Sequence, residues 1–560
     1  MFFTGRLSVF LFILSINVLH THAHNQDFHG SAKWKLAQIA RQGSSLNGSV
    51  MPNAQSAPLG GVGETFRVQG SDELVEPEYV DMPLDHFFGS TNSTFKNRFW
   101  VSEASYVGQG RPVFVYDAGE ANAESSLPFL ERESSFFRKM VDEFGGIGII
   151  WEHRFYGKSS PISKTDPTTD EHYRYLTIKQ ALHDVAAFAA NFSRPDFPTF
   201  DLTPASTPWV FVGGSYPGSR AAWMRQFYPH IIFASYASSA PVQIDRDLDN
   251  YYDQIYRGMN AYGFGNCTKD IHAAIGNVDK ILKKKDRKKK AALKQQFLGL
   301  KGDKMIDGDF AFYLANIFSS WQSSGMDGGL REFCDSIETD EKGRIAGPEG
   351  WAKRRGAKFA TKQWAMAPRP RQEGDDDSAD SESWGFQSCT ELMGRPTPNK
   401  GSMQIVSSFL PRPGQDAIGC WPFWVPQNDT NKQYGGWNIR PSRTFWTAGE
   451  FDPWTPFTLF SKESAAPQPK VTSEIPDCNA REKGEIFGQF IKNAEHAFDF
   501  GSTPEAAKAT DLFTGALKHW LQCFRTTGRY PKLVHDDHEQ HEHDDSVFEC
   551  GVGLSPSCVR

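Results

Sequence analysis

The stretch VFVGGSYPGSRAAW, residues 210–223, sets one serine between an apolar, strand-like run and a helix-like run. A serine on such a sharp strand-to-helix turn is typical of a nucleophile elbow. Gly213 and Gly214 leave the room that a reversing chain needs beside a neighbouring strand. The stretch therefore predicts a sheet covered by helices, with Ser215 as a nucleophile at the end of a buried strand.

Pro217 departs from the G-x-S-x-G pattern, because the expected glycine arrives one residue late, at Gly218. Proline suits the first turn of a helix, where its missing N–H has no intrahelical acceptor and its fixed φ is helical. We therefore expect a functioning elbow with slightly wider packing. A helix N-terminus favours negative charge, so the Tyr216 N–H is one candidate oxyanion donor. The second is expected from the loop 117–121, and we assign it to Gly119.

Short apolar runs bounded by turns predict further strands. Helix-like runs at 130–141 and 178–190 lie between them, and Ala181, Leu182, Val185, Ala186 and Ala189 fall on one helical face. Alternation of strands and helices, with fully apolar strands, predicts a parallel sheet covered on both faces. The expected strands are 97–102, 112–116, 145–151, 443–449 and 485–491.

A serine hydroxyl is a weak nucleophile unless a histidine and an orienting acid stand beside it. In an α/β-hydrolase the acid and then the histidine follow the serine along the chain, each after a strand. Asp452 and His496 occupy those places after the strands 443–449 and 485–491. We therefore assign them as the partners of Ser215. Rivals are the acids Glu450 and Asp499 and the histidines His153, His183, His230 and His519.

The chain divides into five segments by composition. Arg6, the apolar run 7–19 and Ala23 predict a secretory signal peptide. The alternative is a membrane anchor, but the run is shorter than the roughly 20 residues that span a bilayer. No later segment has transmembrane character. The expected segments are a signal peptide (1–23), a weakly structured lead-in (24–75), an α/β domain (76–245 and 436–530), a helical insertion (246–435) and a tail rich in His and acids (531–560).

Secretion agrees with the sequons and the cysteines. Eight cysteines without C-x-x-C spacing favour disulfides over zinc. The formal charge of -7 indicates neither nucleic acid nor an anionic membrane as partner. The basic run 280–291 is expected to be a solvated helix face, and the acidic tract 373–382 an exposed loop. The glycosylation acceptors are Asn47, Asn92, Asn191, Asn266 and Asn428.

Around these residues the sequence resembles the family of prolylcarboxypeptidase, dipeptidyl peptidase II and thymus-specific serine protease. Matching pieces run from about residue 80 to 525 and include both the elbow 213–218 and the turn 449–454. The others are Asp85-His-Phe87 with the strand region 99–101, Trp151-Glu-His-Arg-Phe-Tyr-Gly157, 176–182 with Asp184, Ala222-Trp223, Tyr228-Pro-His230 and Trp384-Gly-Phe-Gln-Ser-Cys-Thr-Glu391.

The resemblance implies an α/β-hydrolase fold with a mostly helical cap inserted after the nucleophile half. It implies peptidases that prefer proline before the scissile bond, act near a peptide terminus and commonly work at acidic pH. The family triad falls on Ser215, Asp452 and His496. Two departures are Pro217 and the loop 117–120, where Asp-Ala-Gly-Glu stands in place of Gly-Asn-Glu-Gly and Glu120 aligns with the family's acid. Both bear on substrate preference more than on the chemistry.

The leading hypothesis is a secreted serine exopeptidase, either a carboxypeptidase or a dipeptidyl peptidase, that cleaves after proline. Glu120, Trp384 and Trp454 are candidate substrate residues, with core packing as the alternative role for either tryptophan. Expected partners are proline-containing peptides, without nucleic acid or stable membrane insertion, and no cofactor or metal is expected. A homodimer and a vacuolar or lysosome-like location stay open. Alternatives are an esterase or lipase of the same fold, or a non-catalytic binding protein.

Overall fold

The computed structural model describes residues 75–87, 89, 91–161, 173–245, 247–368, 378–392, 395–411, 427–478, 480 and 484–527. The expected signal peptide, the lead-in segment and the His-rich tail lie outside the described residues, as do Asn47 and residues 373–377 of the acidic tract. Residues 378–382 of that tract begin a helix and Asp380 is buried, so the prediction of an exposed loop was wrong there. Within the described part, no helix has the length and apolar character needed to cross a membrane.

A nine-stranded sheet in the order β1-β2-β4-β3-β5-β6-β9-β11-β10 forms the centre of the molecule. All neighbouring strands are parallel except β2, which runs antiparallel to β1 and β4. This topology is that of an α/β-hydrolase, as expected, although the prediction of a wholly parallel sheet was wrong at β2. The strands are β1 Glu78–Pro83, β2 Thr94–Ser102, β3 Val113–Asp117, β4 Ile147–Trp151, β5 Trp209–Gly214, β6 Ala234–Ser238, β9 Thr444–Gly449, β10 Lys470–Thr472 and β11 Glu485–Ile491.

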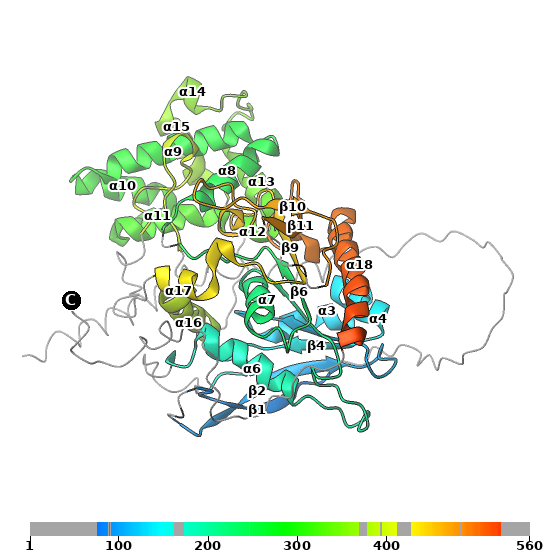
Figure 1. Cartoon of the computed structure of the whole chain (residues 1–560). Coiled ribbons are helices and arrows are strands. Elements are labelled where there is room, and N and C mark those ends of the chain that lie inside the picture. Colours follow the sequence, from blue (N-terminus) through cyan, green and yellow to red (C-terminus); the bar gives the residue numbers. More distant parts are fainter. Residues whose placement is uncertain are drawn as a thin grey trace, which may run out of the picture.

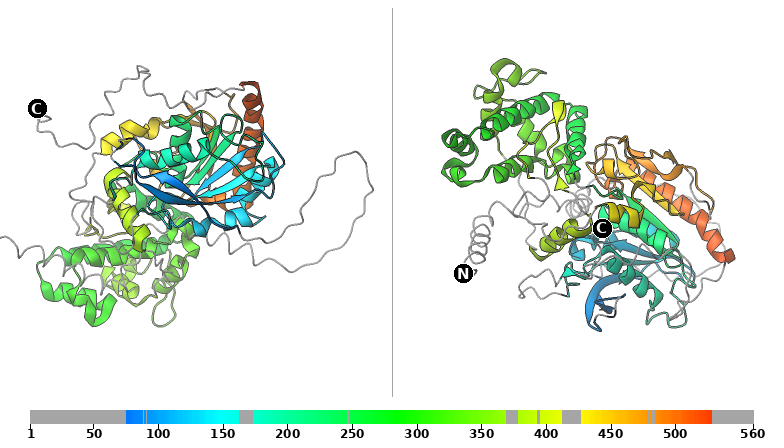
Figure 2. Two further views of the ribbon diagram at one scale, coloured as in Figure 1. Left: turned by 90° about the horizontal axis from the view of Figure 1, so that it is seen from below. Right: turned by 60° about the vertical axis from the view of Figure 1, so that its left-hand side comes forward.

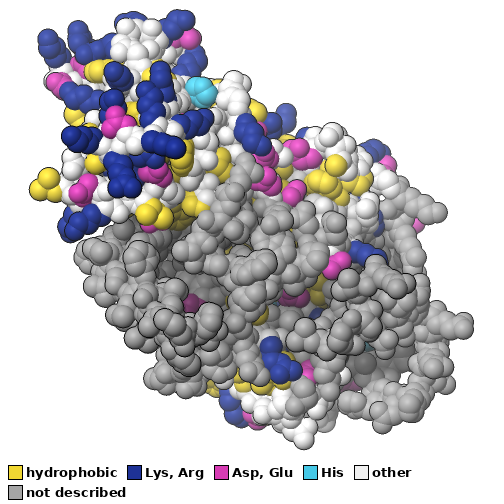
Figure 3. Space-filling model, turned by 90° about the vertical axis from the view of Figure 1, so that its left-hand side faces the viewer, with side chains coloured by type: hydrophobic (Ala, Val, Ile, Leu, Met, Phe, Trp, Pro, Cys, Tyr) yellow, Lys and Arg dark blue, Asp and Glu magenta, His cyan; other side chains and the backbone are white. Residues whose placement is uncertain are grey.

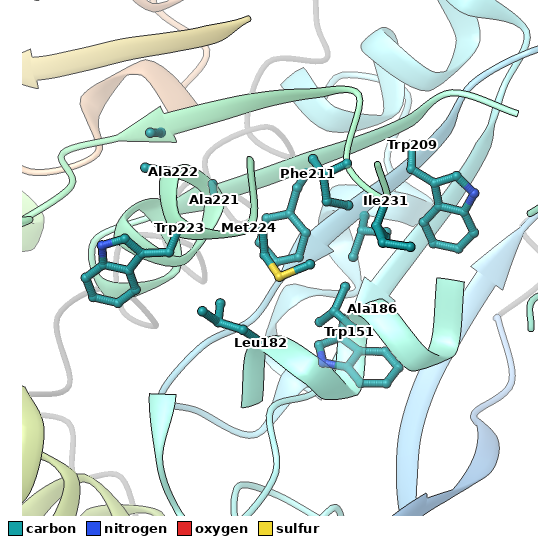
Figure 4. Close-up of a cluster of buried hydrophobic side chains, with 14 of the residues drawn as sticks. Trp151, Leu182, Ala186, Trp209, Phe211, Ala221, Ala222, Trp223, Met224 and Ile231 are labelled. Carbon is teal, nitrogen blue, oxygen red and sulfur yellow. The ribbon is translucent and has the colours of Figure 1, made fainter. Parts of the chain in front are cut away.

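Helices cover both faces of the sheet (Figure 1). The helices α6 Ile178–Ala190 and α7 Tyr216–Phe227 pack on one face, where Leu182, Met224 and Trp209 meet in a common core (Figure 4). The five positions predicted to share one face of α6 are all buried, so that prediction is confirmed. On the other face lie α3 Pro128–Glu131, α4 Phe136–Phe144 and α18 Pro504–Thr527.

The prediction of one helix over 130–141 was wrong. The chain leaves the helical conformation at Arg132, which is extended, and α4 starts anew after Ser135. The Ser135 hydroxyl accepts a hydrogen bond from the N–H of Arg138 and so caps the new helix. A serine inside an apolar periodic run was thus the signal of a second helix start.

The expected insertion, 246–435, packs in two different ways. Its first helices share a core of their own and form a separate group beside the sheet half (Figures 1 and 2). By contrast, Trp384 of α16 Ser378–Gln387 and Tyr434 of α17 Gln427–Tyr434 pack on the core that α6 and α7 share. We call the first group the cap: α8 Asn250–Ala261, α9 Gly265–Leu282, α10 Arg287–Leu298, α11 Asp307–Ala315, α12 Trp321–Ser324, α13 Leu330–Ile337, α14 Ala352–Arg355 and α15 Ala357–Met366.

Disulfides join elements within each half, which confirms the prediction for the described cysteines. Cys267–Cys334 links α9 to α13 within the cap, and Cys478–Cys523 links the segment before β11 to α18. Cys389 is disulfide-bonded as well. Cys420, Cys550 and Cys558 lie outside the described residues.

Candidate active site

Ser215 stands on a strained turn between β5 and α7. Its φ of 68° and ψ of -132° lie in a region that L-residues rarely occupy, and its side chain is buried. The Ser215 N–H donates to the carbonyl oxygen of Ser238 at 2.9 Å, which fixes the turn to the end of β6. This is the geometry of a nucleophile elbow.

The room for the tight turn comes from glycines, as predicted. A Cβ on Gly213 would lie 2.2 Å from the carbonyl oxygen of Pro217, and one on Gly218 would lie 2.5 Å from that of Ser238. Both contacts are with backbone atoms, which have little freedom to move. A side chain at either position would therefore force the elbow apart.

The room for the Pro217 ring comes from the neighbouring loop. Gly119 has a φ of +65°, and a Cβ there would lie 2.2 Å from Cγ of Pro217. The proline thus packs directly on the loop assigned as the second half of the oxyanion hole. Pro217 and Gly119 therefore pack directly against each other, a contact that the sequence did not indicate.

Asp452 and His496 are in hydrogen-bond contact. Nδ1 of His496 lies 2.9 Å from Oδ1 and 3.0 Å from Oδ2 of Asp452, and both side chains are almost fully buried. Because the carboxylate accepts a hydrogen bond from Nδ1–H, the neutral ring keeps its proton on Nδ1 and its free lone pair lies on Nε2. Asp452 is itself held by the N–H of Trp454, which donates to Oδ1 at 2.8 Å.

The loop that carries His496 lies against the elbow. The N–H of Ala497 donates to Oγ of Ser239 at 2.9 Å, one residue from the Ser238 carbonyl that anchors Ser215. A Cβ on Gly214 would stand 3.4 Å from Cβ of Ala497. The residues that flank the serine and those that flank the histidine therefore share one site at the end of β6.

The family model of serine carboxypeptidase S28 matches residues 82–480, a span that contains Ser215 and Asp452 and most of the described fold. The chain belongs to the serine carboxypeptidase S28 family. His496 lies beyond the end of the match, so its role rests on its contact with Asp452.

Curated relatives of this S28 chain are peptidases by name. It is 27% identical to the probable extracellular serine carboxypeptidase of Arthroderma benhamiae over 67% of this chain and 58% of that protein. It is also 27% identical to mouse thymus-specific serine protease, over 81% of this chain and 89% of that protein. Identity with mouse lysosomal Pro-X carboxypeptidase is 22%, over 67% of this chain and 78% of that protein.

The rival acids have other partners. Oε2 of Glu450 accepts from the N–H of Asn493 at 3.0 Å. Asp499 is buried, and its two oxygens accept from the hydroxyls of Ser238 and Thr447 at 2.7 and 2.8 Å. Both carboxylates thus brace the loops around His496 instead of orienting its ring.

The rival histidine His153 is engaged beside the nucleophile. Its Nδ1 lies 2.6 Å from the carbonyl oxygen of Arg154, so that nitrogen carries the proton and Nε2 accepts from the Tyr216 hydroxyl at 3.0 Å. Burial and the Arg220 guanidinium hold the pKa of His153 well below its ordinary value. Because both ring nitrogens of the neutral His153 are engaged in hydrogen bonds, we interpret His153 as a residue that positions Tyr216.

Gln387 is a site residue that sequence reasoning missed. Its Nε2 donates to the Tyr216 hydroxyl at 2.6 Å, and its Oε1 accepts from the Tyr156 hydroxyl at 2.9 Å. The residue after the nucleophile is therefore tied to α16, far away in the sequence. Gln387 lies in the motif 384–391, but a glutamine between aromatic residues carried no chemical signal of this role.

Asp117 and Arg220 form a buried ion pair beneath the loop 117–121. Nη1 of Arg220 lies 2.8 Å from Oδ2 of Asp117, and both side chains are fully buried. The Gly119 N–H donates to Oδ1 of Asp117 at 3.2 Å. As an oxyanion donor, Gly119 would have to exchange this partner for the substrate, so its assignment stays a prediction. The Tyr216 N–H belongs to the first residue of α7, where helical N–H groups have no intrahelical acceptor.

The cap contacts the loops that carry Asp452 and His496. Trp321 donates to the carbonyl oxygen of Phe451 at 2.9 Å, and Trp454 donates to Oε1 of Gln322 at 2.8 Å. These two bonds hold the residues on either side of Asp452. The Tyr262 hydroxyl donates to Oε1 of Glu495, the residue before His496, at 2.7 Å. Asp452 and His496 are thus positioned partly from the cap.

The expected glycosylation sites differ in their surroundings. Asn92 and Asn191 are exposed. Asn266 is half-buried, and its amide donates to Oε2 of Glu338 at 2.9 Å. Glycosylation stays a prediction for these three, and the Asn428 side chain lies outside the described residues. In the described part of the chain, no group of three or more His, Cys, Asp or Glu is arranged to hold a metal ion.

Proposed function

We propose that this S28 protein is a secreted serine exopeptidase that cleaves peptides after proline. The observation that carries the proposal is the buried Asp452–His496 pair, 2.9 Å apart, behind a serine elbow with a φ of 68°. The family supplies the reaction class, and the name of the Pro-X carboxypeptidase relative supports the preference for proline.

Ser215 Oγ attacks the peptide carbonyl while Nε2 of His496 takes its proton. Asp452 stabilises the imidazolium that forms. His496 then gives the proton to the leaving amine, and the peptide C–N bond breaks. Water, activated by the same nitrogen, hydrolyses the acyl-enzyme and restores Ser215. The N–H of Tyr216 and, after it leaves Asp117, that of Gly119 would stabilise the oxyanion.

Trp384 and Trp454 are the proposed lining of a proline pocket, although each also packs on a hydrophobic core. The Trp384 ring lies 5.9 Å from that of Tyr216, which follows the nucleophile. The Trp454 ring lies 5.5 Å from that of Tyr251 and follows Asp452 by two residues. Flat apolar rings close to Ser215 and Asp452 in the sequence or the fold would suit a pyrrolidine ring.

Glu120 is the proposed reader of the peptide terminus. Its Oε2 is buried and accepts no hydrogen bond from the described residues, and burial raises the pKa of Glu120 to about 7. At acidic pH a protonated Glu120 can donate to a substrate carboxylate, which favours a carboxypeptidase. Glu120→Gln, which keeps a donor without charge, should then retain carboxypeptidase turnover at pH 5. A dipeptidyl peptidase would need the ionised carboxylate to bind the α-ammonium and would lose turnover.

A fluorophosphonate probe tests the nucleophile. We expect the secreted protein to be labelled, Ser215→Ala to be unlabelled and Ser219→Ala, a serine of the same turn and helix, to be labelled as the wild type. Labelling that persists in Ser215→Ala would overturn the assignment. A wild type without labelling would favour a binding protein.

A panel of peptides with proline at each position and with free or blocked termini tests the substrate. We expect release of the residue after proline only when the carboxyl terminus is free. Release of an amino-terminal dipeptide would instead identify a dipeptidyl peptidase. Turnover of esters without turnover of peptides would overturn the peptidase proposal.

A further inference from the structure

One side of the cap carries a concentration of positive charge that the catalytic reaction does not use. Residues 280–304 contain 11 Lys and Arg but only 2 Asp and Glu, in a chain with a net charge of -7. They form the end of α9, the turn into α10, α10 itself and the short helix Gly299–Lys304. We call this segment, together with Ile306, the basic edge.

Most of these cations have no acidic partner. Lys289 pairs with Asp286, and Lys290 and Lys294 pair with Asp307. The other eight are exposed and pair with no acidic side chain of the described residues: Lys280, Lys283, Lys284, Lys285, Arg287, Lys288, Lys301 and Lys304. Figure 3 shows Lys and Arg side chains crowded over the cap on the side where α10 lies in Figure 1. Unpaired cations that lie close together repel one another. They therefore attract an anionic surface that neutralises them.

Two large aliphatic side chains project from the same edge. Leu300 is 89% exposed, the highest value among the exposed large hydrophobic residues of the described chain, and Ile306 is 64% exposed. The segment that carries both residues packs on α10, because Lys294 donates to the carbonyl oxygen of Met305 at 2.6 Å and Gly302 lies against the backbone of Lys294. Covering the exposed surface of a leucine or isoleucine side chain with an apolar phase is favourable in free energy.

We propose that the basic edge docks the protein on the surface of an anionic lipid bilayer, with the lysines at the headgroups and Leu300 and Ile306 inserted between them. Cationic side chains that surround protruding aliphatic ones fit a phospholipid surface, which offers negative charge and an apolar layer together. A soluble polyanion such as an acidic polysaccharide uses the charge alone and leaves both aliphatic side chains in water. This docking is independent of the proposed peptidase activity.

Cosedimentation of the full-length protein with phosphatidylcholine vesicles, with and without phosphatidylglycerol, tests the proposal. We expect binding only to vesicles with phosphatidylglycerol, and weaker binding as salt rises. The triple variant Lys284→Glu/Arg287→Glu/Lys288→Glu should bind at least about tenfold more weakly. The matched control Lys139→Glu/Lys492→Glu/Lys508→Glu reverses three exposed lysines of the sheet half and should bind as the wild type.

The double variant Leu300→Ser/Ile306→Ser separates a membrane from a soluble polyanion. We expect it to lose binding to the anionic vesicles, whereas Val107→Ser, an exposed aliphatic residue of the sheet half, should not. Fluorophosphonate labelling of each variant checks that it is folded. The proposal is overturned if the wild type does not bind the vesicles. It is equally overturned if the double variant binds as tightly as the wild type, or if heparin is bound with an affinity that only the charge reversals reduce.

Discussion

The Tyr262 hydroxyl donates a hydrogen bond of 2.7 Å to the carboxylate of Glu495, the residue that immediately precedes His496. Tyr262 ends α8 of the cap, whereas Glu495 lies on the loop after β11. One bond between side chains thus joins the cap to the loop of His496. The Glu495 carboxylate also fills the space beside Gly325, where a Cβ would lie 2.5 Å from Oε1.

Loss of this bond should slow catalysis by loosening the loop of His496. We expect Tyr262→Phe to lower kcat about tenfold, equivalent to about 1.4 kcal/mol, with little change in KM. Steady-state kinetics on a proline-containing peptide measure the effect. Glu495→Gln keeps an acceptor for the hydroxyl and should retain most of kcat, and Tyr256→Phe, in the same helix, should match the wild type. A lower unfolding midpoint with an unchanged kcat would show that the bond only stabilises the fold.

Asp452→Asn should remove the preference for the reactive tautomer of His496. An amide facing Nδ1 no longer favours the proton there, so Nε2 is less often available as a base. We expect kcat to fall by about four orders of magnitude without a change in the unfolding midpoint. Glu450→Gln, two residues earlier, is the control and should keep its activity. If Glu450→Gln were the more damaging change, the acid would be misassigned.

Gly119 and Pro217 should behave as a coupled pair. Gly119→Ala forces a methyl group against the proline ring and a residue with a side chain into a φ of +65°, costs of about 1–3 and 1–2 kcal/mol. We expect loss of stability and of kcat. Gly119→Ala/Pro217→Gly removes the clash and should recover part of both. Chemical denaturation and peptide turnover of the two single variants and the double variant measure the coupling, and strict additivity would contradict the contact.

Acidic pH should stabilise the fold through Glu391. Its Oε2 accepts from the N–H of Ile178 at the start of α6, and burial raises the pKa of the carboxyl from 4.5 to about 7. Between these values the folded state keeps a proton that the unfolded state releases, so stability falls as pH rises and is level above about 7. One such group changes the free energy of unfolding by at most about 3 kcal/mol.

Glu391→Gln has no proton to lose and should flatten this dependence. Unfolding midpoints measured at intervals from pH 4 to 8 should decline less steeply in the variant than in the wild type. Glu76→Gln, at an exposed position, should keep the wild-type slope. An unchanged slope in Glu391→Gln would mean that other groups carry the pH dependence.

Much of the sheet could be read from the sequence because each element has a local pattern. The predicted bounds of α6 and β11 equal those observed, and Ser215, Asp452 and His496 follow strands as expected. The break between α3 and α4 depends on one capping serine, which periodicity does not register. β2 runs against its neighbours because of the connections around it, and no property of its own residues reveals this.

Contacts between segments far apart in the chain could not be predicted from a single sequence. The bonds that tie Gln387 to Tyr216 and Tyr262 to Glu495 join residues far apart along the chain. Glutamine and tyrosine also occur in many other settings, so neither carried a signal. The packing of Pro217 on Gly119 could not be inferred either, because hydrophobic patterns report burial and not the partner that buries a residue.

β7 Asp247–Leu248 pairs with β8 Arg395–Pro396, so the segment between them, which contains the helices of the cap, begins and ends at one place. The entropy of closing an inserted segment grows only slowly with its length, so a segment whose two ends lie side by side can lengthen or shorten with little effect on the stability of the domain that carries it. The outer helices of the cap, with their lysines, can therefore change in length at little expense to the half that carries Ser215.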